Sequence, residues 1–379
     1  KTLFSTNSYL NFSGYTDDLT MEVDFDIYEN LTKNKNSDKF EYISSYQFSK
    51  FLKNNIEFNL SGFQKQFDTN VSETILVNDA SYTSNLRLSK TGFETNYELF
   101  FKNVLTNTNN STSHKDYEDA RLYSTLKYNS SYPLINKGSK YDNYITPKLS
   151  FMFSPTKTRD LSDRDERLAI DNIYSANRTG SNDTLEGGES LTVGSEYKFL
   201  NKNDSELLRL NLATVLRNNR NLDLPKTSKL GEKYSDIVGE LNIEPNDNIN
   251  FNYDFSLDKS LNRANYNFVD ASFNVNNFVT TFEFLEENNE IGSESYIGNK
   301  TKYSLNDSQI LSFSTRKNRK TDLTEFYNLL YQYQNDCLIA SIEYNKDYYS
   351  DGELQPNEEI YFSFTITPFA TIKSPSIGK

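Results

Sequence analysis

Asn248-Ile-Asn-Phe-Asn-Tyr-Asp-Phe-Ser-Leu257 alternates strictly between polar and apolar residues. The odd positions carry Ile, Phe, Tyr, Phe and Leu, and the even positions carry only Asn, Asp and Ser. Successive side chains of an extended strand point to opposite faces, so this stretch is predicted to be a strand with one apolar and one polar face. We expect residues such as Phe251 to face lipid and residues such as Asn252 to face a wet lumen.

The same alternation recurs along the chain, for example in residues 21–27, 56–60, 208–212, 338–344 and 360–366. About 19 such segments are predicted, and none of comparable length shows a sustained helical period. Their connections alternate between short turns, such as 244–247, 274–277 and 305–308, and longer polar loops. The predicted long loops are 30–38, 103–118, 155–187, 217–232, 258–264, 285–294 and 349–357. This pattern predicts an antiparallel meander of hairpins.

The polar faces favour one architecture for these strands. A soluble sandwich or solenoid would bury a repeated Asn/Asp/Ser face at a large cost in free energy. A membrane barrel instead turns the apolar face into lipid and keeps the polar face around water. The predicted fold is therefore an all-β, antiparallel transmembrane β-barrel in the outer membrane of a Gram-negative bacterium. A soluble β-rich surface adhesin is the less favoured alternative.

Composition narrows the function. The chain of 379 residues has 40 basic and 53 acidic side chains, a net charge of −13, which argues against nucleic-acid binding. A single Cys and a single His, His114, exclude an internal disulfide framework and a two-histidine metal motif. A Ser/His/Asp site would have to depend on His114, in a loop of Asn, Ser and Thr. We expect no enzymatic activity, no cofactor and no metal ion.

Several segments resemble one family. Tyr144–Phe153 contains Pro-Lys within a strand pattern, and 171–194 contains Asn-Arg, Asn-Asp and Glu-Gly-Gly in order. Asp38–Ile43 and Tyr331–Leu338 add a Glu-Tyr strand and a strand–Cys–strand pattern. Together they resemble LptD, the family of lipopolysaccharide-assembly outer-membrane proteins. The resemblance implies a 26-stranded barrel, preceded by a periplasmic jelly-roll domain and filled by an LptE-like plug lipoprotein.

The resemblance places residues 1–379 as the C-terminal barrel part of such a protein, with the jelly roll and the first strands absent. An odd strand count agrees, because single-chain bacterial barrels have even numbers of strands. The implied function is assembly of lipopolysaccharide into the outer leaflet by lateral release through the barrel seam. The implied partners are lipopolysaccharide, the plug lipoprotein, the periplasmic bridge proteins that reach the jelly roll, and the barrel-assembly machinery. A passive porin or transporter barrel is the alternative function.

Two site predictions concern the C-terminal hairpins. Cys337 lies in a turn that is expected to be periplasmic, and the resemblance implies a disulfide from it to the jelly roll; a free thiol is the alternative. The segment 358–369 is predicted to be the closing strand and one edge of the lateral gate. Its gate residues are Ile360, Phe362, Phe364, Ile366, Pro368 and Phe369. The alternative is the last strand of an ordinary closed barrel.

The loop 155–187 is rich in charge of both signs. Its selected residues are Arg159, Asp163, Arg164, Arg178, Asp183 and Glu186. We expect an extracellular cap whose Arg–carboxylate pairs fold it over or into the lumen. A solvated loop is the alternative, and the carboxylate spacing is only a weak signal for calcium.

Overall fold

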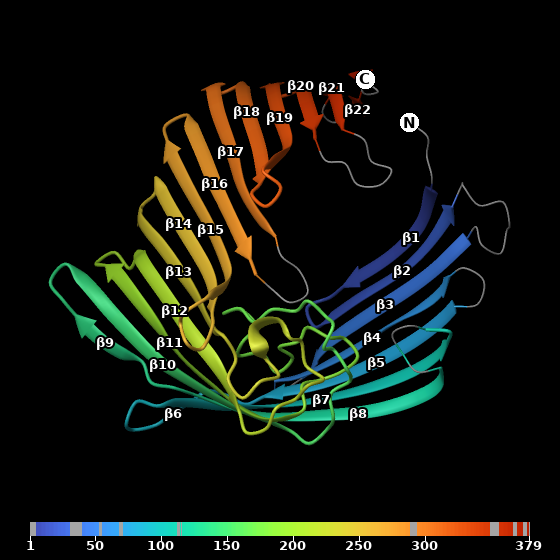
Figure 1. Ribbon diagram of the computed structural model, residues 1–379, viewed down its shortest axis with the longest axis vertical. Coiled ribbons are helices and arrows are strands. Elements are labelled where there is room, and N and C mark those ends of the chain that lie inside the picture. The colour runs from blue at the N-terminus through green and yellow to red at the C-terminus, as the bar shows by residue number, and fades with distance from the viewer. Residues whose placement is uncertain are drawn as a thin grey trace.

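The computed structural model describes residues 5–30, 40–52, 55–67, 71–111, 114, 116–288, 294–348, 356–366, 370–373 and 377–378. The strands of these residues form one 23-stranded sheet, which curves into an open ring in Figure 1. The one helical element in these ranges is the 3-10 turn η2 (Thr227–Lys229). No helix in the described part of the chain is long and apolar enough to cross a membrane.

Within the described ranges, nineteen strands have between 9 and 16 residues, which confirms the predicted number. They are β1 (Ser5–Tyr15), β2 (Leu19–Asn30), β3 (Phe40–Leu52), β4 (Ile56–Phe67), β5 (Val71–Thr83), β7 (Glu94–Asn109), β8 (Tyr117–Ser131), β10 (Tyr141–Ser154), β11 (Gly188–Asn201), β12 (Glu206–Arg217), β13 (Ile237–Asn246), β14 (Ile249–Leu257), β15 (Ala264–Val275), β16 (Phe278–Glu287), β17 (Ser295–Asn306), β18 (Gln309–Asn318), β19 (Leu323–Gln334), β20 (Leu338–Asp347) and β21 (Asn357–Ile366). The short strands are β6 (Arg87–Leu88), β9 (Leu134–Lys137), β22 (Ala370–Lys373) and β23 (Ile377–Gly378).

Each long strand pairs antiparallel with the next long strand along the chain, as in a meander. On β14, for example, Tyr253 lies opposite Leu241 of β13 and Val269 of β15. Two predicted loops are too long. Residues 285–287 still belong to β16, and residues 103–109 and 117–118 continue β7 and β8, with Thr108 opposite Tyr117. Backbone hydrogen bonds extend this hairpin through Asn and Thr, because the ladder does not require apolar side chains.

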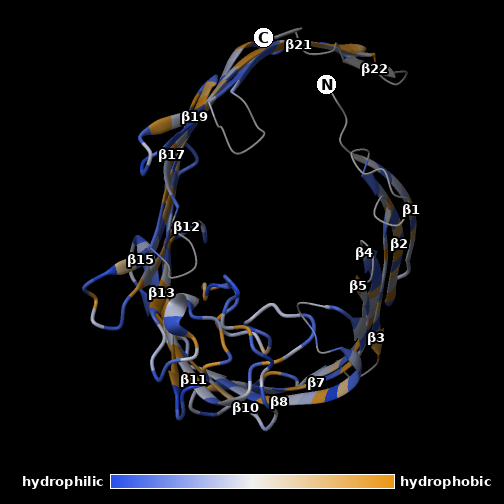
Figure 2. Ribbon diagram, turned by 45° about the vertical axis from the view of Figure 1, so that its right-hand side comes forward, coloured by the Kyte–Doolittle hydropathy of each residue, from blue (hydrophilic) through white to orange (hydrophobic). Residues whose placement is uncertain are grey.

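The two faces of the sheet differ as predicted. On β10, Phe151 is 42% exposed on the convex face, whereas Ser150 is 3% exposed on the concave face. On β14, Asn252 bonds to the side chains of Asn242 and Asn250, which share its parity, so that Phe251 lies on the opposite face. Figure 2 shows hydrophobic and hydrophilic residues alternating along the strands, with loops inside the ring. The apolar side chains thus point outward and the polar ones toward the lumen, the reverse of a soluble barrel.

Candidate functional site

Two long loops at one end of the sheet fold into its concave side (Figure 1). We call residues 155–187 loop A and residues 218–236 loop B. Leu168 and Ile173 of loop A pack with Leu224 and Leu230 of loop B in a buried cluster. The same cluster includes Ala213 and Val215 of β12 and Val238 of β13. Each such buried side chain contributes about 1.5–3 kcal/mol, so the loops have a hydrophobic core of their own.

A second cluster fixes the far end of loop A to the opposite part of the wall. Leu185 is buried against Ile75 and Val77 of β5, Val104 of β7 and Tyr123 of β8. Near it, Lys102 of β7 donates to Asp79 Oδ2 and to the carbonyl oxygen of Asn182, both at 2.9 Å. Loop A therefore spans the lumen from β12 and β13 to β5, β7 and β8.

A buried charge cluster joins loop A to β11, β12 and loop B. Arg178 Nε donates to Glu186 Oε2 at 2.9 Å, and its Nη1 donates to Thr192 Oγ1 at 2.9 Å. Arg217 also pairs with Glu186 and donates from Nε to the carbonyl oxygen of Leu230 at 2.9 Å. Two guanidinium groups thus share one carboxylate, and neutral oxygens of Thr192, Ser190, Leu230 and Gly187 accept four further N–H hydrogen bonds. Removing one member of such a buried pair costs about 3–5 kcal/mol.

A second charge cluster connects loop A with the β7–β8 loop. Asp183 Oδ2 lies 2.7 Å from His114 Nε2 and 2.8 Å from Arg159 Nη1. Burial by itself would raise the pKa of Asp183, but the hydrogen bond with His114 and the charge of Arg159 outweigh it and lower the pKa to about 2. Ser181 also donates to Asp183 Oδ1 at 2.8 Å. His114 thus belongs to a hydrogen-bonded cluster with Asp183 and Arg159 that fixes loop A to the β7–β8 loop.

The selected residues of loop A do not all take part in these clusters. Arg159, Arg178, Asp183 and Glu186 do, and their side chains are largely withdrawn from solvent. Asp163, with a side chain that is 94% exposed, only approaches Lys226 at 3.6 Å. Arg164 lies 3.9 Å from Glu166 and is also solvent-accessible.

Two members of the clusters were not selected from the sequence. Arg217 is the last residue of β12 and has the alternation of the inward-facing residues. A basic residue at such a position, next to a long loop, is the sequence signal that points to a partner in the lumen. His114 gives no signal of this role in the sequence, because no local pattern connects it with Asp183, 69 positions away.

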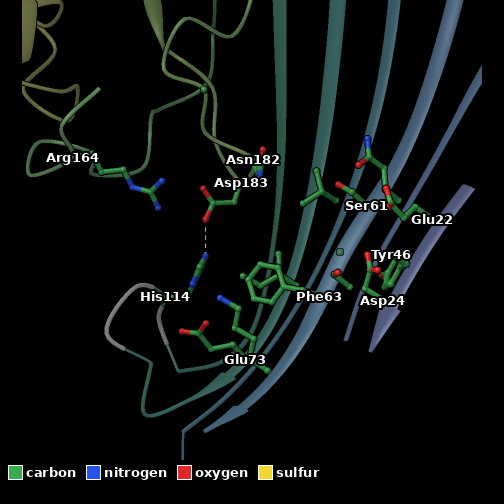
Figure 3. A pocket seen from close by; sticks show the side chains of 17 residues that line it. Glu22, Asp24, Tyr46, Ser61, Phe63, Glu73, His114, Arg164, Asn182 and Asp183 are labelled. Atoms are coloured by element: carbon green, nitrogen blue, oxygen red, sulfur yellow. Dashed lines mark hydrogen bonds and ion pairs between the residues drawn. The ribbon is translucent and has the colours of Figure 1, made fainter. Parts of the chain in front are cut away.

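A polar groove of about 470 Å³ lies between loop A and the wall formed by β2, β3, β4 and β5. In Figure 3, His114, Asp183 and Arg164 border one side of it, while Phe63, Glu73 and Asp24 come from the strands. Acidic and basic side chains face each other across this groove. In the described part of the chain, no group of three or more His, Cys, Asp or Glu side chains is arranged to hold a metal ion.

The two edges of the sheet are formed by the ends of the chain. β1 pairs with β2, and within the described ranges it has no partner on its other side. At the opposite edge β21 pairs along its whole length with β20, while its Ser363–Ile366 segment also pairs with β22 and its Glu359–Ile360 segment with β23. The sheet is therefore an open ring between β1 and the β21–β23 edge (Figure 2).

The predicted closing strand needs a correction. It ends at Ile366, and β22 turns back to pair with it, so β21 is not the last strand. Ile360, Phe364 and Ile366 are exposed on the outer face as expected, with Phe364 at 50%, and Phe362 shares their parity. Ser363 points inward, with its Oγ 2.7 Å from Ser341 Oγ. Pro368 and Phe369 lie outside the described residues.

Cys337 lies in the short turn between β19 and β20, at the end of the sheet opposite loops A and B. Its thiol is exposed and free. The side chain of Asn335 accepts the backbone N–H groups of Cys337 at 3.0 Å and Leu338 at 2.8 Å, which fixes the turn. The thiol is therefore presented to solvent on an ordered backbone.

Comparison with known proteins identifies a family. The family model described as "LptD: LPS transport system D" matches residues 4–308. The matched range includes loops A and B and the Glu-Gly-Gly block, whereas Cys337 and β21 lie beyond it. No curated protein matches the chain.

Solved structures with similar chain traces include two siderophore receptors. The receptor PirA from Acinetobacter baumannii has 7% identity and a TM-score of 0.44, with 97% of this chain and 72% of the receptor covered. A mutant of the ferric enterobactin receptor PfeA from Pseudomonas aeruginosa has 8% identity and a TM-score of 0.45, with 96% and 70% covered.

Proposed function

Because the chain belongs to the LptD family of lipopolysaccharide transport proteins, we propose that it assembles lipopolysaccharide into the outer leaflet by releasing it sideways through the barrel seam. The family membership also makes it an outer-membrane β-barrel protein that acts in lipopolysaccharide transport. The observation that carries lateral release is the short pairing at this edge of the sheet. Within the described ranges, β22 and β23, of four and two residues, border β21 on the seam side, whereas the ten-residue β20 borders its other side.

Few hydrogen bonds have to break for such an edge to open. Each backbone hydrogen bond contributes only about 0.5–1.5 kcal/mol net, so a short ladder separates at a small cost in free energy. Loops A and B support the same proposal, because they occupy part of the lumen at the long-loop end and so obstruct an exit along the barrel axis. A passive porin or transporter is the alternative function.

Disulfide cross-linking across the seam tests lateral release. One cysteine replaces Lys373 of β22, which pairs with Ser363 from the seam side, and the other is placed on the first strand of the barrel in the full-length protein. We expect oxidation to stop delivery of lipopolysaccharide to the cell surface and reduction to restore it. A Ser341→Cys/Ser363→Cys pair is the matched control, because it joins neighbours in the wall and leaves the seam free. Normal delivery through a cross-linked seam would contradict the proposal.

We also propose that residues 1–379 form the C-terminal barrel part of a longer protein with a periplasmic jelly roll. That jelly roll would receive lipopolysaccharide from the periplasmic bridge, and the barrel-assembly machinery would insert the barrel. The gene sequence upstream of Lys1 tests this domain assignment. A reading frame without a jelly-roll domain would contradict it.

The plug lipoprotein is proposed to bind the inner wall that loops A and B leave uncovered. The contacts of loop A reach as far as β15 and β16, where Arg167 stacks on the Tyr266 ring at 3.8 Å and pairs with Glu287. Beyond these strands, the inner face of β19 and β20 carries polar side chains such as Asn328, Glu343 and Asn345, which bond to one another. Such a polar face suits a protein partner with matching hydrogen-bonding groups.

A further inference from the structure

A cavity of about 670 Å³ lies among loop B, loop A and the loop between β14 and β15. Five basic side chains line it: Arg220, Lys226, Lys229, Lys233 and Lys259. Glu232 is the one acidic side chain among the residues that line it. The cavity therefore has a local excess of positive charge in a chain whose net charge is −13. An electropositive cavity of this kind attracts anions.

Neighbouring carboxylates neutralise only part of this charge. Arg220 pairs with Glu232 at 2.8 Å, Lys229 pairs with Asp258, and Lys226 lies 3.6 Å from Asp163. Lys233 and Lys259 have no ion pair within the described ranges, and the ammonium of Lys259 lies 5.8 Å from the centre of the Tyr234 ring. Two cations are therefore available to a ligand.

The backbone around the cavity is already ordered for binding. Asn221 N donates to the carbonyl oxygen of Gly231 at 2.8 Å, and a Cβ at Gly231 would collide with the carbonyl oxygen of Asn221. Arg217 N donates to the carbonyl oxygen of Lys233 at 2.9 Å. Leu224 and Leu230, on either side of η2, are buried in the loop core. A ligand would thus meet a formed site and would not have to order a free loop.

The lining of the cavity also includes exposed apolar groups. Leu222 is 77% exposed and Tyr234 is also exposed, while Leu224 and Pro225 of the lining are buried. A free inorganic anion would gain nothing from these groups. An anion attached to a lipid or to a hydrophobic sugar face would cover them, with a gain of about 25 cal/mol per Å².

We propose that this cavity binds the phosphomonoester group of an anionic amphiphile at the outer-leaflet end of the barrel. Lys233 and Lys259 would pair with the phosphate oxygens, while Leu222 and Tyr234 would contact the apolar part of the ligand. The inference depends on the proposed function only in taking the long loops to face the outer leaflet.

Native mass spectrometry of the full chain in maltoside micelles tests this proposal. The probes are dioctanoyl phosphatidic acid, dioctanoyl phosphatidylcholine and inorganic phosphate. We expect phosphatidic acid to bind at least about tenfold more tightly than either of the other two, and Lys233→Gln/Lys259→Gln to remove this preference. Lys233→Arg/Lys259→Arg should retain it, because the charge is kept.

The matched control is Lys90→Gln/Lys140→Gln, which removes two exposed lysines from turns at the opposite end of the sheet. It should bind like the unmodified chain. Equal binding of phosphatidic acid and phosphatidylcholine, equal binding of free phosphate, or full binding by the Gln variant would each overturn the proposal. The assay does not measure lipopolysaccharide delivery, so its failure is separate from a failure of the seam cross-link.

Discussion

Arg178 and Glu186 form an ion pair inside the lumen with side chains that are 1% and 0% exposed. Both belong to loop A, eight positions apart, and Glu186 also binds Arg217 at the end of β12. The carboxylate therefore connects a loop of the lumen to the wall of the barrel. Because water does not reach the pair, loss of either member leaves a buried charge without compensation.

Glu186→Gln is expected to release loop A from the wall. Two buried guanidinium groups would lose their shared anion, at a cost of about 3–5 kcal/mol to the closed loop. Hydrogen exchange of residues 159–186 should become faster, while exchange in β10 and β11 stays slow. The control is Glu189→Gln, which changes an exposed carboxyl at the start of β11, three positions after Glu186. Unchanged exchange in the Glu186 variant would show that the pair does not hold the loop.

Loop A should also loosen in acid. The pKa of Asp183 falls from 3.8 to about 2 in the folded protein, so its carboxylate stabilises the loop fully above about pH 4, and this stability is lost as the pH falls toward 2. The shift corresponds to about 2 kcal/mol. Exchange of residues 181–186, measured between pH 5 and 2, should show this loss, and Asp183→Asn should remove it. The exposed Asp163→Asn variant should titrate like the unmodified chain; a flat profile in the unmodified chain would contradict the ion-pair assignment.

Cys337 is predicted to form a disulfide with a cysteine outside this sequence in the full-length protein. Its turn lies at the short-turn end, which faces the oxidising periplasm in outer-membrane barrels. Non-reducing electrophoresis of the full-length protein should show a mobility shift that reduction and Cys337→Ser both abolish. Equal mobility of the oxidised and reduced proteins would instead establish a free thiol.

The position of the plug lipoprotein can be tested by photo-cross-linking. A photoreactive residue at Asn328, on the inner face of β19, should capture the lipoprotein, because inward side chains reach the lumen. The matched control carries the photoreactive residue in place of Leu329, which is exposed on the outer face, and should label lipid. Capture of the lipoprotein from Leu329 and not from Asn328 would place the plug elsewhere.

The amino-acid sequence by itself determined the strands, their order and the two faces of the wall. A period of two residues is a local property, and in residues 249–257 it needs no partner to be recognised. The alternation of short and long connections likewise indicated which turns share an end, and so placed Cys337 opposite loop A. The Glu-Gly-Gly block around Glu186 indicated the family, which the match over residues 4–308 confirmed.

Only the tertiary structure decided what loop A does with its charges. The sequence showed Arg and carboxylate residues in the loop, but a solvated loop has a similar composition. Glu186 takes Arg217 as its second partner because the pairing of β11 with β12 sets Arg217 opposite Ser190. Asp183 meets His114, and Leu185 meets Ile75 of β5, because strands β5 to β11 curve until loop A lies against the β5–β8 part of the wall. Such contacts depend on curvature and on distances across the lumen, and these arise from the summed twist of many strands, which no local period records.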